Sequence, residues 1–225
     1  MFPRTYFGTE IFPKGEIRFE NFCLRYRPDT PDVLRHLSFV IKPGEKIGIV
    51  GRTGSGKSTM MLGLLRIIEA WEGRIVIDGK DISKLSLEEL RSNINIILQD
   101  HFMFTGTVKE NVDPTGSHTD EQVEEALKLC GVWESFTKDG VNSHVAEGGD
   151  NLSAGEKQLL NITRSLLNPK RVVLIDEATA SIDFETDAQI QKVIKKQFAD
   201  KTVLTIAHRI NTVVNSDRIL VLSKG

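Results

Sequence analysis

The chain has 225 residues, enough for one large domain or for one core with an attached lobe. A formal charge of −2 and a pI near 6.2 argue against a nucleic-acid-binding surface. No apolar stretch has the length of a membrane span, and the N-terminus carries no signal-peptide pattern. The cysteines, Cys23 and Cys130, match no metal-binding spacing, so we expect a reduced, cytosolic setting.

Strand and helix patterns alternate along most of the chain. Strand patterns occur at residues 15–22, 34–50, 73–82, 93–100, 171–177, 202–208 and 218–222, with a Pro-Gly turn inside the second segment. Helices are expected at 57–68, after Ser86, from Thr119 to Leu129, after Ser153, at 185–198 and shortly before the last strand. Such alternation predicts an α/β fold with a mainly parallel sheet covered on both faces.

The stretch between Asp100 and Asn151 contains no convincing strand. We therefore expect an α-helical lobe, at about residues 100–168, inserted into the α/β core. The chain ends directly after a strand-like run, which we interpret as a piece of a longer protein.

The segment "GRTGSGKS", Gly51 to Ser58, fits the phosphate-loop pattern G-x-x-x-x-G-K-[ST]. It follows a buried strand and opens a helix, which is the context that the motif requires. Glycines allow backbone N–H groups to surround phosphates, Lys57 supplies a positive charge, and the Ser58 hydroxyl can bind Mg²⁺. The residues that we assign to nucleotide binding here are Gly51, Arg52, Thr53, Gly54, Ser55, Gly56, Lys57, Ser58 and Thr59.

The strand "RVVLIDE" ends in two carboxylates. Ligands of open α/β sheets bind at the carboxyl ends of the strands, so Asp176 is a candidate for holding Mg²⁺. Glu177 is a candidate general base for an attacking water. Alone, the pair would be two solvated carboxylates; beside a phosphate loop, the functional interpretation is favoured.

The segment "NLSAGEKQLLNITRSLL" allows two interpretations. Ser153 and Glu156 form a capping-box pattern before an apolar helix, and this account needs no ligand. A helix N-terminus with small residues can also bind a phosphate.

Together these motifs resemble the ATP-binding cassette, the nucleotide-binding domain of ABC transporters, over essentially the whole chain. "LSAGE" is similar to the family's signature sequence, "ILQD" to its Q-loop, "SID" to its D-loop and "IAHR" to its switch region. The resemblance implies a P-loop NTPase core with an N-terminal antiparallel β subdomain and an inserted helical lobe, so that residues 1–225 form a single nucleotide-binding domain. It implies ATP and Mg²⁺ as cofactors.

The resemblance also implies roles for single residues. Gln99 would bind Mg²⁺ with Ser58 and Asp176, His208 would contact the γ-phosphate, and Tyr26 in "LRYRP" would stack on adenine. Catalysis would then rest on the residues Glu177, His208 and Gln99.

In this family two domains pair head to tail, and the signature of one binds the γ-phosphate held by the other. The signature residues would be Ser153, Ala154, Gly155 and Glu156, where Ala154 and Glu156 replace the commoner glycine and glutamine. We expect the Glu156 carboxylate to point away from the phosphate. The Ser153 hydroxyl can still cap the helix when no ligand is present.

"FTGTVKENVDP" is similar to the C subfamily, the multidrug-resistance-associated transporters, and the presence of Glu177 resembles their second nucleotide domain. His101 stands where proline is common.

The partners implied are transmembrane domains and a second nucleotide-binding domain, at the cytosolic face of a membrane, with no nucleic acid. At least one of Phe102, Met103 and Phe104 is expected to be exposed for a coupling helix. The alternatives are a channel or channel regulator, or a soluble cassette ATPase acting on DNA or ribosomes.

Overall fold

The computed structural model describes residues 10–98, 102–176, 182–207 and 210–225. They belong to two compact units. The core unit takes residues 8–96, 170–177 and 200–225, and the helical unit takes 97–169 and 178–199, in each case as far as they are described. Among the described residues, no helix is both long enough and apolar enough to span a bilayer.

The first sheet of the core unit has the strand order β2-β1-β4-β5. Its strands are β1 (Ile17–Leu24), β2 (Leu34–Ile41), β4 (Glu72–Ile77) and β5 (Lys80–Asp81). Strand β1 pairs antiparallel with β2 and β4, and β4 with β5, so that Ile17 lies opposite Ile41 on one side and Ile77 on the other. The expected N-terminal antiparallel β subdomain is therefore confirmed.

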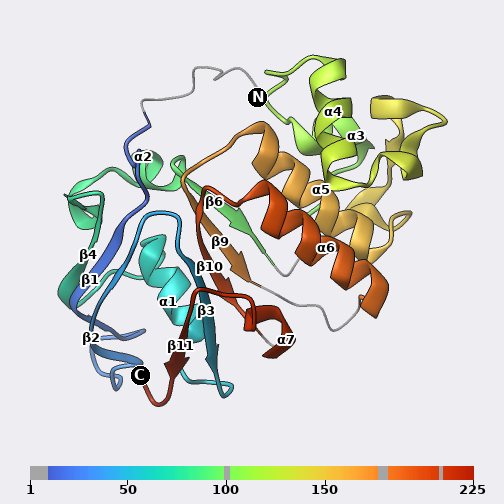
Figure 1. Cartoon of the computed structure of the whole chain (residues 1–225). Helices are drawn as coiled ribbons and strands as arrows, with labels where there is room; N and C mark the ends of the chain where they lie inside the picture. The colour runs from blue at the N-terminus through green and yellow to red at the C-terminus, as the bar shows by residue number, and fades with distance from the viewer. Residues whose placement is uncertain (1–9, 99–101, 177–181, 208–209) are drawn as a thin grey trace. The chain divides into compact units, whose positions relative to one another are not determined.

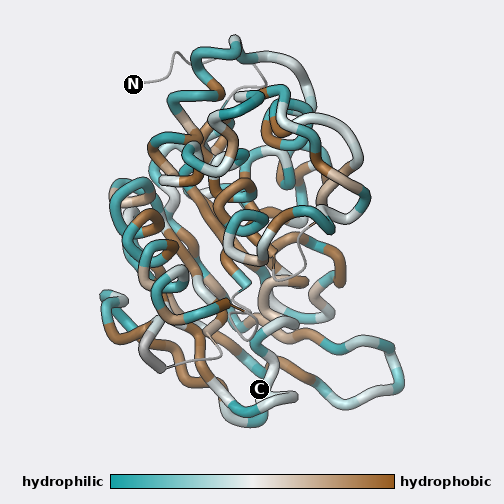
Figure 2. Tube along the Cα trace, turned by 90° about the vertical axis from the view of Figure 1, so that its right-hand side faces the viewer, coloured by the Kyte–Doolittle hydropathy of each residue, from teal (hydrophilic) through white to brown (hydrophobic). Residues whose placement is uncertain are grey.

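The second sheet has the order β11-β3-β10-β9-β6. It contains β3 (Lys46–Gly51), β6 (Ile94–Ile97), β9 (Val172–Asp176), β10 (Thr202–Ile206) and β11 (Arg218–Leu222). Strand β10 runs parallel to both β3 and β9, and β11 runs parallel to β3 (Figure 1). The predicted mainly parallel sheet is confirmed, and its central strands are predominantly hydrophobic, as Figure 2 shows.

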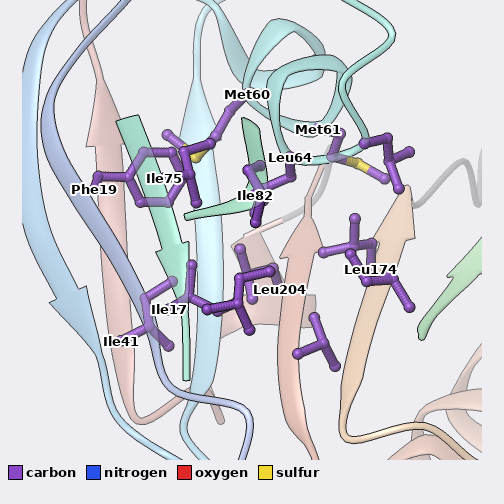
Figure 3. Packing of buried hydrophobic residues seen from close by; sticks show 14 of the residues in the cluster. Ile17, Phe19, Ile41, Met60, Met61, Leu64, Ile75, Ile82, Leu174 and Leu204 are labelled. Carbon is purple, nitrogen blue, oxygen red and sulfur yellow. The ribbon is translucent and has the colours of Figure 1, made fainter. Parts of the chain in front are cut away.

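Helix α1 (Lys57–Leu64) joins the two sheets of the core unit into one hydrophobic core. Figure 3 shows Met60, Met61 and Leu64 of this helix beside residues of both sheets, which include Ile17, Ile75, Leu174 and Leu204. Burial of this apolar surface stabilises the unit, because each buried aliphatic side chain contributes about 1.5–3 kcal/mol relative to exposure. The core unit also contains α2 (Leu87–Arg91), the 3₁₀ helix η1 (Ile82–Lys84) and α7 (Ile210–Val213).

Helix α1 ends four residues earlier than the sequence pattern predicts. Arg66 adopts a left-handed backbone with φ 49°, which stops the helix after Leu64. Its guanidinium donates to the carbonyl oxygens of Ile82 and Leu85 at 2.9 and 2.6 Å. A long-range contact therefore overrides the local helical pattern.

The helical unit contains α3 (Val108–Val112), α4 (Asp120–Cys130), α5 (Ala154–Leu167) and α6 (Phe184–Gln197). The 3₁₀ helices η2 (Trp133–Phe136), η3 (Gly140–Asn142) and η4 (Glu147–Gly149) link them. Two short antiparallel strands, β7 (Gly106–Thr107) and β8 (His144–Val145), occur where no strand was expected, because two residues give no period-2 pattern. The α6 segment joins this unit although it lies beyond residue 168.

Candidate nucleotide-binding site

The loop between β3 and α1 depends on glycine for its shape. A Cβ atom at Gly51 would lie 2.3 Å from Ser55 Oγ, and one at Gly56 would lie 2.7 Å from a Leu34 methyl carbon. Gly54 and Gly56 have φ values of 79° and 103°, in the region that favours glycine. The loop therefore turns tightly at the carboxyl end of β3.

The N-terminus of α1 differs from those of α2 to α6. Its N-cap residue, Gly56, gives no side-chain hydrogen bond, whereas side chains cap α2 to α6. The first N–H groups of a helix have no partner within the helix and carry its positive dipole end. The start of α1 is thus left open for an anion such as a phosphate group.

Lys57 lies folded over this loop. Its ammonium donates to the carbonyl oxygens of Gly51 at 2.5 Å and Arg52 at 3.2 Å, and the side chain is buried. The buried Ser55 hydroxyl has no hydrogen-bond partner among the described residues. A cation and an unused hydroxyl therefore lie beside the open helix start, which fits the binding of a polyphosphate.

Asp176 ends β9, and the sheet register places it near the same edge as the loop. It is level with Ile206 of β10, and Ile206 is level with Ile49 of β3. Two strand spacings separate β3 from β9, or about 10 Å. Asp176 and the Ser58 hydroxyl offer oxygen ligands, the kind that Mg²⁺ prefers. These two residues thus fit the ion.

Tyr26 contacts the first turn of α1. Its hydroxyl lies 2.8 Å from Thr59 Oγ1, although the two residues are 33 positions apart. The side chain is 55% exposed. The hydroxyl is held while the ring stays open to a ligand, as a stacking platform requires.

The signature helix α5 begins with the capping box that the sequence predicts. The Ser153 hydroxyl accepts from the Glu156 N–H at 3.2 Å, and a Glu156 carboxylate oxygen accepts from the Ser153 N–H at 2.8 Å. The carboxylate therefore lies at the helix start. This confirms the capping interpretation, while the orientation of Glu156 toward a bound phosphate stays a prediction.

Gly155 also has a packing role that the sequence did not indicate. A Cβ atom at this position would lie 2.3 Å from the Thr186 methyl carbon of α6. Glycine therefore allows α5 and α6 to approach closely. Ala154, the neighbouring signature residue, is the first residue of α5.

The segment before α3 is held by an internal network that sequence reasoning missed. The Asn111 amide pairs with both the N–H and the carbonyl of Phe104, at 2.8 and 2.9 Å. Arg164 of α5 donates twice to the Asn111 carbonyl, at 2.9 and 2.7 Å, and burial lowers the pKa of its guanidinium. Phe102 and Phe104 are exposed while Met103 is buried, so the expectation that at least one of the three is exposed is confirmed.

Several predicted site residues lie outside the described part of the chain. They are Gln99, His101, Glu177, Ser181 and His208. Their assignments rest on the sequence motifs alone.

A glycine-rich loop after a parallel strand, an open helix start and a carboxylate on a second strand define a P-loop nucleotide-binding protein. The comparisons with known proteins agree. Residues 34–180 match the family model described as ABC transporter. The chain belongs to the ABC transporter family, and it is a nucleotide-binding ATPase domain of the kind found in ABC exporters.

Two relatives and one solved structure illustrate the similarity. The chain is 49% identical over 215 residues to Metal resistance protein YCF1 of Saccharomyces cerevisiae, covering 94% of this chain and 14% of that protein. It is 49% identical over 215 residues to human ATP-binding cassette sub-family C member 3, covering 95% and 14%. A bacterial Atm1-family ABC exporter with ATP bound superposes with a TM-score of 0.87 at 33% identity, covering 96% of this chain and 38% of that one. The chain spans only a small part of these transporters.

Proposed function

We propose that this domain binds MgATP at its P-loop, hydrolyses it in a head-to-tail pair with a second nucleotide-binding domain, and thereby drives export through transmembrane domains. The observation that carries the proposal is the open start of α1, the one among α1 to α6 without a side-chain cap, with the Lys57 ammonium beside it. This is where the β- and γ-phosphates would bind. A bound Mg²⁺ would neutralise charge on the phosphates.

The chain's own residues would divide the work. Lys57 would leave its two carbonyl partners for the phosphates, and Ser58, Gln99 and Asp176 would hold the Mg²⁺. Glu177 would accept the proton of the attacking water. His208 would contact the γ-phosphate. The resemblance supports the roles of Gln99, Glu177 and His208, and the sheet register supports that of Asp176.

The second half of each site would come from the partner domain's signature. The Ser153 hydroxyl lies at the N-cap of α5 and the Gly155 N–H in its first turn, where the helix dipole favours an anion. Binding of a phosphate would require the Glu156 carboxylate to leave the helix start, because two negative charges would otherwise meet there. Cap and phosphate site are thus alternative states of one helix end.

The second domain of a C-subfamily exporter is the finer assignment that we favour. It rests on the presence of Glu177 and on the "LSAGE" sequence, since the first domain usually lacks the base. The hydrogen bonds of Asn111 connect exposed Phe104 to Arg164 of α5. A transmembrane-domain helix that docks on Phe102 and Phe104 could thus shift the signature helix α5 through these hydrogen bonds.

A mixing experiment tests the paired site. Lys57→Ala should be inactive because the phosphates lose a positive charge. Ser153→Arg should be inactive because a large side chain blocks the partner's γ-phosphate. In a mixed pair one site has both an intact Lys57 and an intact Ser153, so ATPase activity should partly return.

The control is the unmodified chain, whose specific activity must rise with concentration under the same conditions. If Ser153 acts only as a cap, its loss costs about 0.5–2 kcal/mol of stability. The mixture would then be no more active than the sum of its parts, and the paired site would be rejected.

A further inference from the structure

Three potential metal ligands converge in the antiparallel sheet of the core unit. They are the Cys23 thiol of β1, the His36 imidazole of β2 and the Glu72 carboxylate of β4. One donor atom from each lies within 4.8 Å of the other two. None of these residues belongs to the nucleotide site. We propose that they form a binding site for Zn²⁺.

The strand register brings the three side chains together. Cys23 lies directly opposite Glu72 in the β1–β4 pairing, and side chains of opposed residues share a face of the sheet. His36 lies at a bulge, since β2 runs three residues from Leu34 to Leu37 while β1 runs two from Leu24 to Phe22. The extra residue lets the His36 side chain meet Cys23.

A second bulge, in β1, adds Asn21 to the cluster. Strand β1 runs three residues from Phe19 to Phe22 while β2 runs two, and Asn21 has a left-handed φ of 47°. The Asn21 amide donates to Glu72 Oε1 at 2.7 Å, and its oxygen lies 2.9 Å from His36 Nδ1. His36 itself has φ 48°. Two non-glycine residues in this conformation within one cluster mark a locally constrained region.

The separation of two of the ligand atoms suits a tetrahedral metal ion. Cys23 Sγ lies 3.4 Å from His36 Nδ1. With a zinc–sulfur bond of about 2.3 Å and a zinc–nitrogen bond of about 2.0–2.1 Å, tetrahedral geometry separates the two ligands by roughly 3.5 Å. The Asn21 oxygen, 2.9 Å from Nδ1, is available as a fourth ligand.

The chemistry of the ligands favours zinc. One thiolate, one imidazole and one carboxylate form a set that Zn²⁺ accepts, whereas Ca²⁺ and Mg²⁺ take oxygen ligands. The thiol is fully buried, while Glu72 is half-buried and His36 is exposed. The thiol is therefore the inner ligand, and His36 is the ligand that solvent reaches.

Binding changes the protons of the cluster in a defined way. The Cys23 thiol releases one proton to water as the sulfur–zinc bond forms. The neutral imidazole binds through Nδ1 as the tautomer protonated on Nε2, so it releases no proton. Near neutral pH, each zinc ion should therefore release about one proton per chain.

Calorimetric titration of the metal-free, reduced 225-residue chain with ZnCl₂, without nucleotide, tests the site. We expect one zinc ion per chain, with proton release measured in buffers of different ionisation enthalpy. Cys23→Ser, His36→Asn and Glu72→Gln should each weaken binding by at least about tenfold, on the scale of lost metal-site residues. The matched controls Cys130→Ser and His144→Asn, which lie in the helical unit, should leave binding unchanged.

Cobalt provides an independent readout. Co²⁺ should produce a sulfur-to-cobalt charge-transfer absorption in the unmodified chain and in Cys130→Ser, but not in Cys23→Ser. If Cys23→Ser does not fold, the surface variants His36→Asn and Glu72→Gln decide the question. Absence of zinc binding, or binding that all three variants retain, would overturn the proposal.

Discussion

The hydroxyl of Tyr26 lies 2.8 Å from the side-chain oxygen of Thr59, so the aromatic ring is fixed to the helix that follows the P-loop. The contact fixes one end of the ring, while Tyr26 stays 55% exposed. It also separates two contributions to ATP binding. One is the stacking surface, and the other is the hydrogen bond that orients it.

Tyr26→Ala should weaken ATP binding by about 1 kcal/mol, or roughly fivefold in Kd, because the stacking surface is lost. Tyr26→Phe keeps the ring and loses only the bond to Thr59, so its effect should be smaller. Calorimetric titration with ATP measures both. Equal affinities for Tyr26→Ala and the unmodified chain would remove Tyr26 from the site.

Glu177→Gln should retain ATP binding and lower hydrolysis by about 10²- to 10⁴-fold, since an amide preserves the shape but cannot accept a proton. Steady-state ATPase assays and nucleotide titration check the two parts. Glu125→Gln, an exposed carboxylate of α4, serves as the control for the change of charge. An unchanged rate in Glu177→Gln would assign the base to another group.

Gly155→Ala should destabilise the chain by about 1–3 kcal/mol, because the new methyl group would lie 2.3 Å from the Thr186 methyl carbon. Thr186→Ser removes that carbon and should restore most of the stability in the double variant. Urea denaturation of the four proteins gives the coupling energy. Additive effects would mean that the two side chains do not clash.

The Asp183 carboxylate caps α6 by accepting from the Thr186 N–H at 3.0 Å. Hydrogen bonds from the Thr186 backbone and side chain lower the pKa of this carboxyl from its ordinary 3.8. A lowered folded-state pKa stabilises the fold above pH 3.8, and the contribution is lost as the pH falls through the lowered pKa.

Asp183→Asn should keep the cap, since asparagine caps about as well as aspartate, while removing this pH dependence. Denaturation midpoints between neutral and acidic pH measure the difference. Asp139→Asn, at a position that gives no side-chain cap, is the control and should leave the fall of the midpoint toward acidic pH unchanged. If the midpoint of Asp183→Asn falls as steeply with pH as that of the unmodified chain, the Asp183 carboxylate does not contribute to the pH dependence of stability.

Local signals predicted the elements that local physics determines. The capping boxes at Ser86, Thr119 and Ser153 formed as their side-chain spacing indicates. The P-loop could be recognised because its glycine pattern and its strand–helix context lie in one short segment. The capping box at Thr107 has the same kind of signal, Thr107-x-x-Glu110, and could have been found from it.

Features that depend on distant contacts could not be predicted. Cys23, His36 and Glu72 meet because of two bulges, and register shifts leave no periodic signal in the sequence. Gly155 of α5 lies against Thr186 of α6, far away in sequence, so the signature motif alone does not predict its packing role. The early end of α1 depends on Arg66 reaching carbonyl groups near residues 82–85.

The position of β10 determines when the nucleotide site can form during synthesis. In the sheet it lies between β3 and β9, yet in the chain it follows both. A nascent chain that stops before Thr202 would contain both Lys57 and Asp176. It would lack β10, the strand that pairs with both β3 and β9 in the sheet. Such long-range parallel pairing is slow and exposes strand edges until it is complete. ATP should therefore bind only after β10 has emerged from the ribosome.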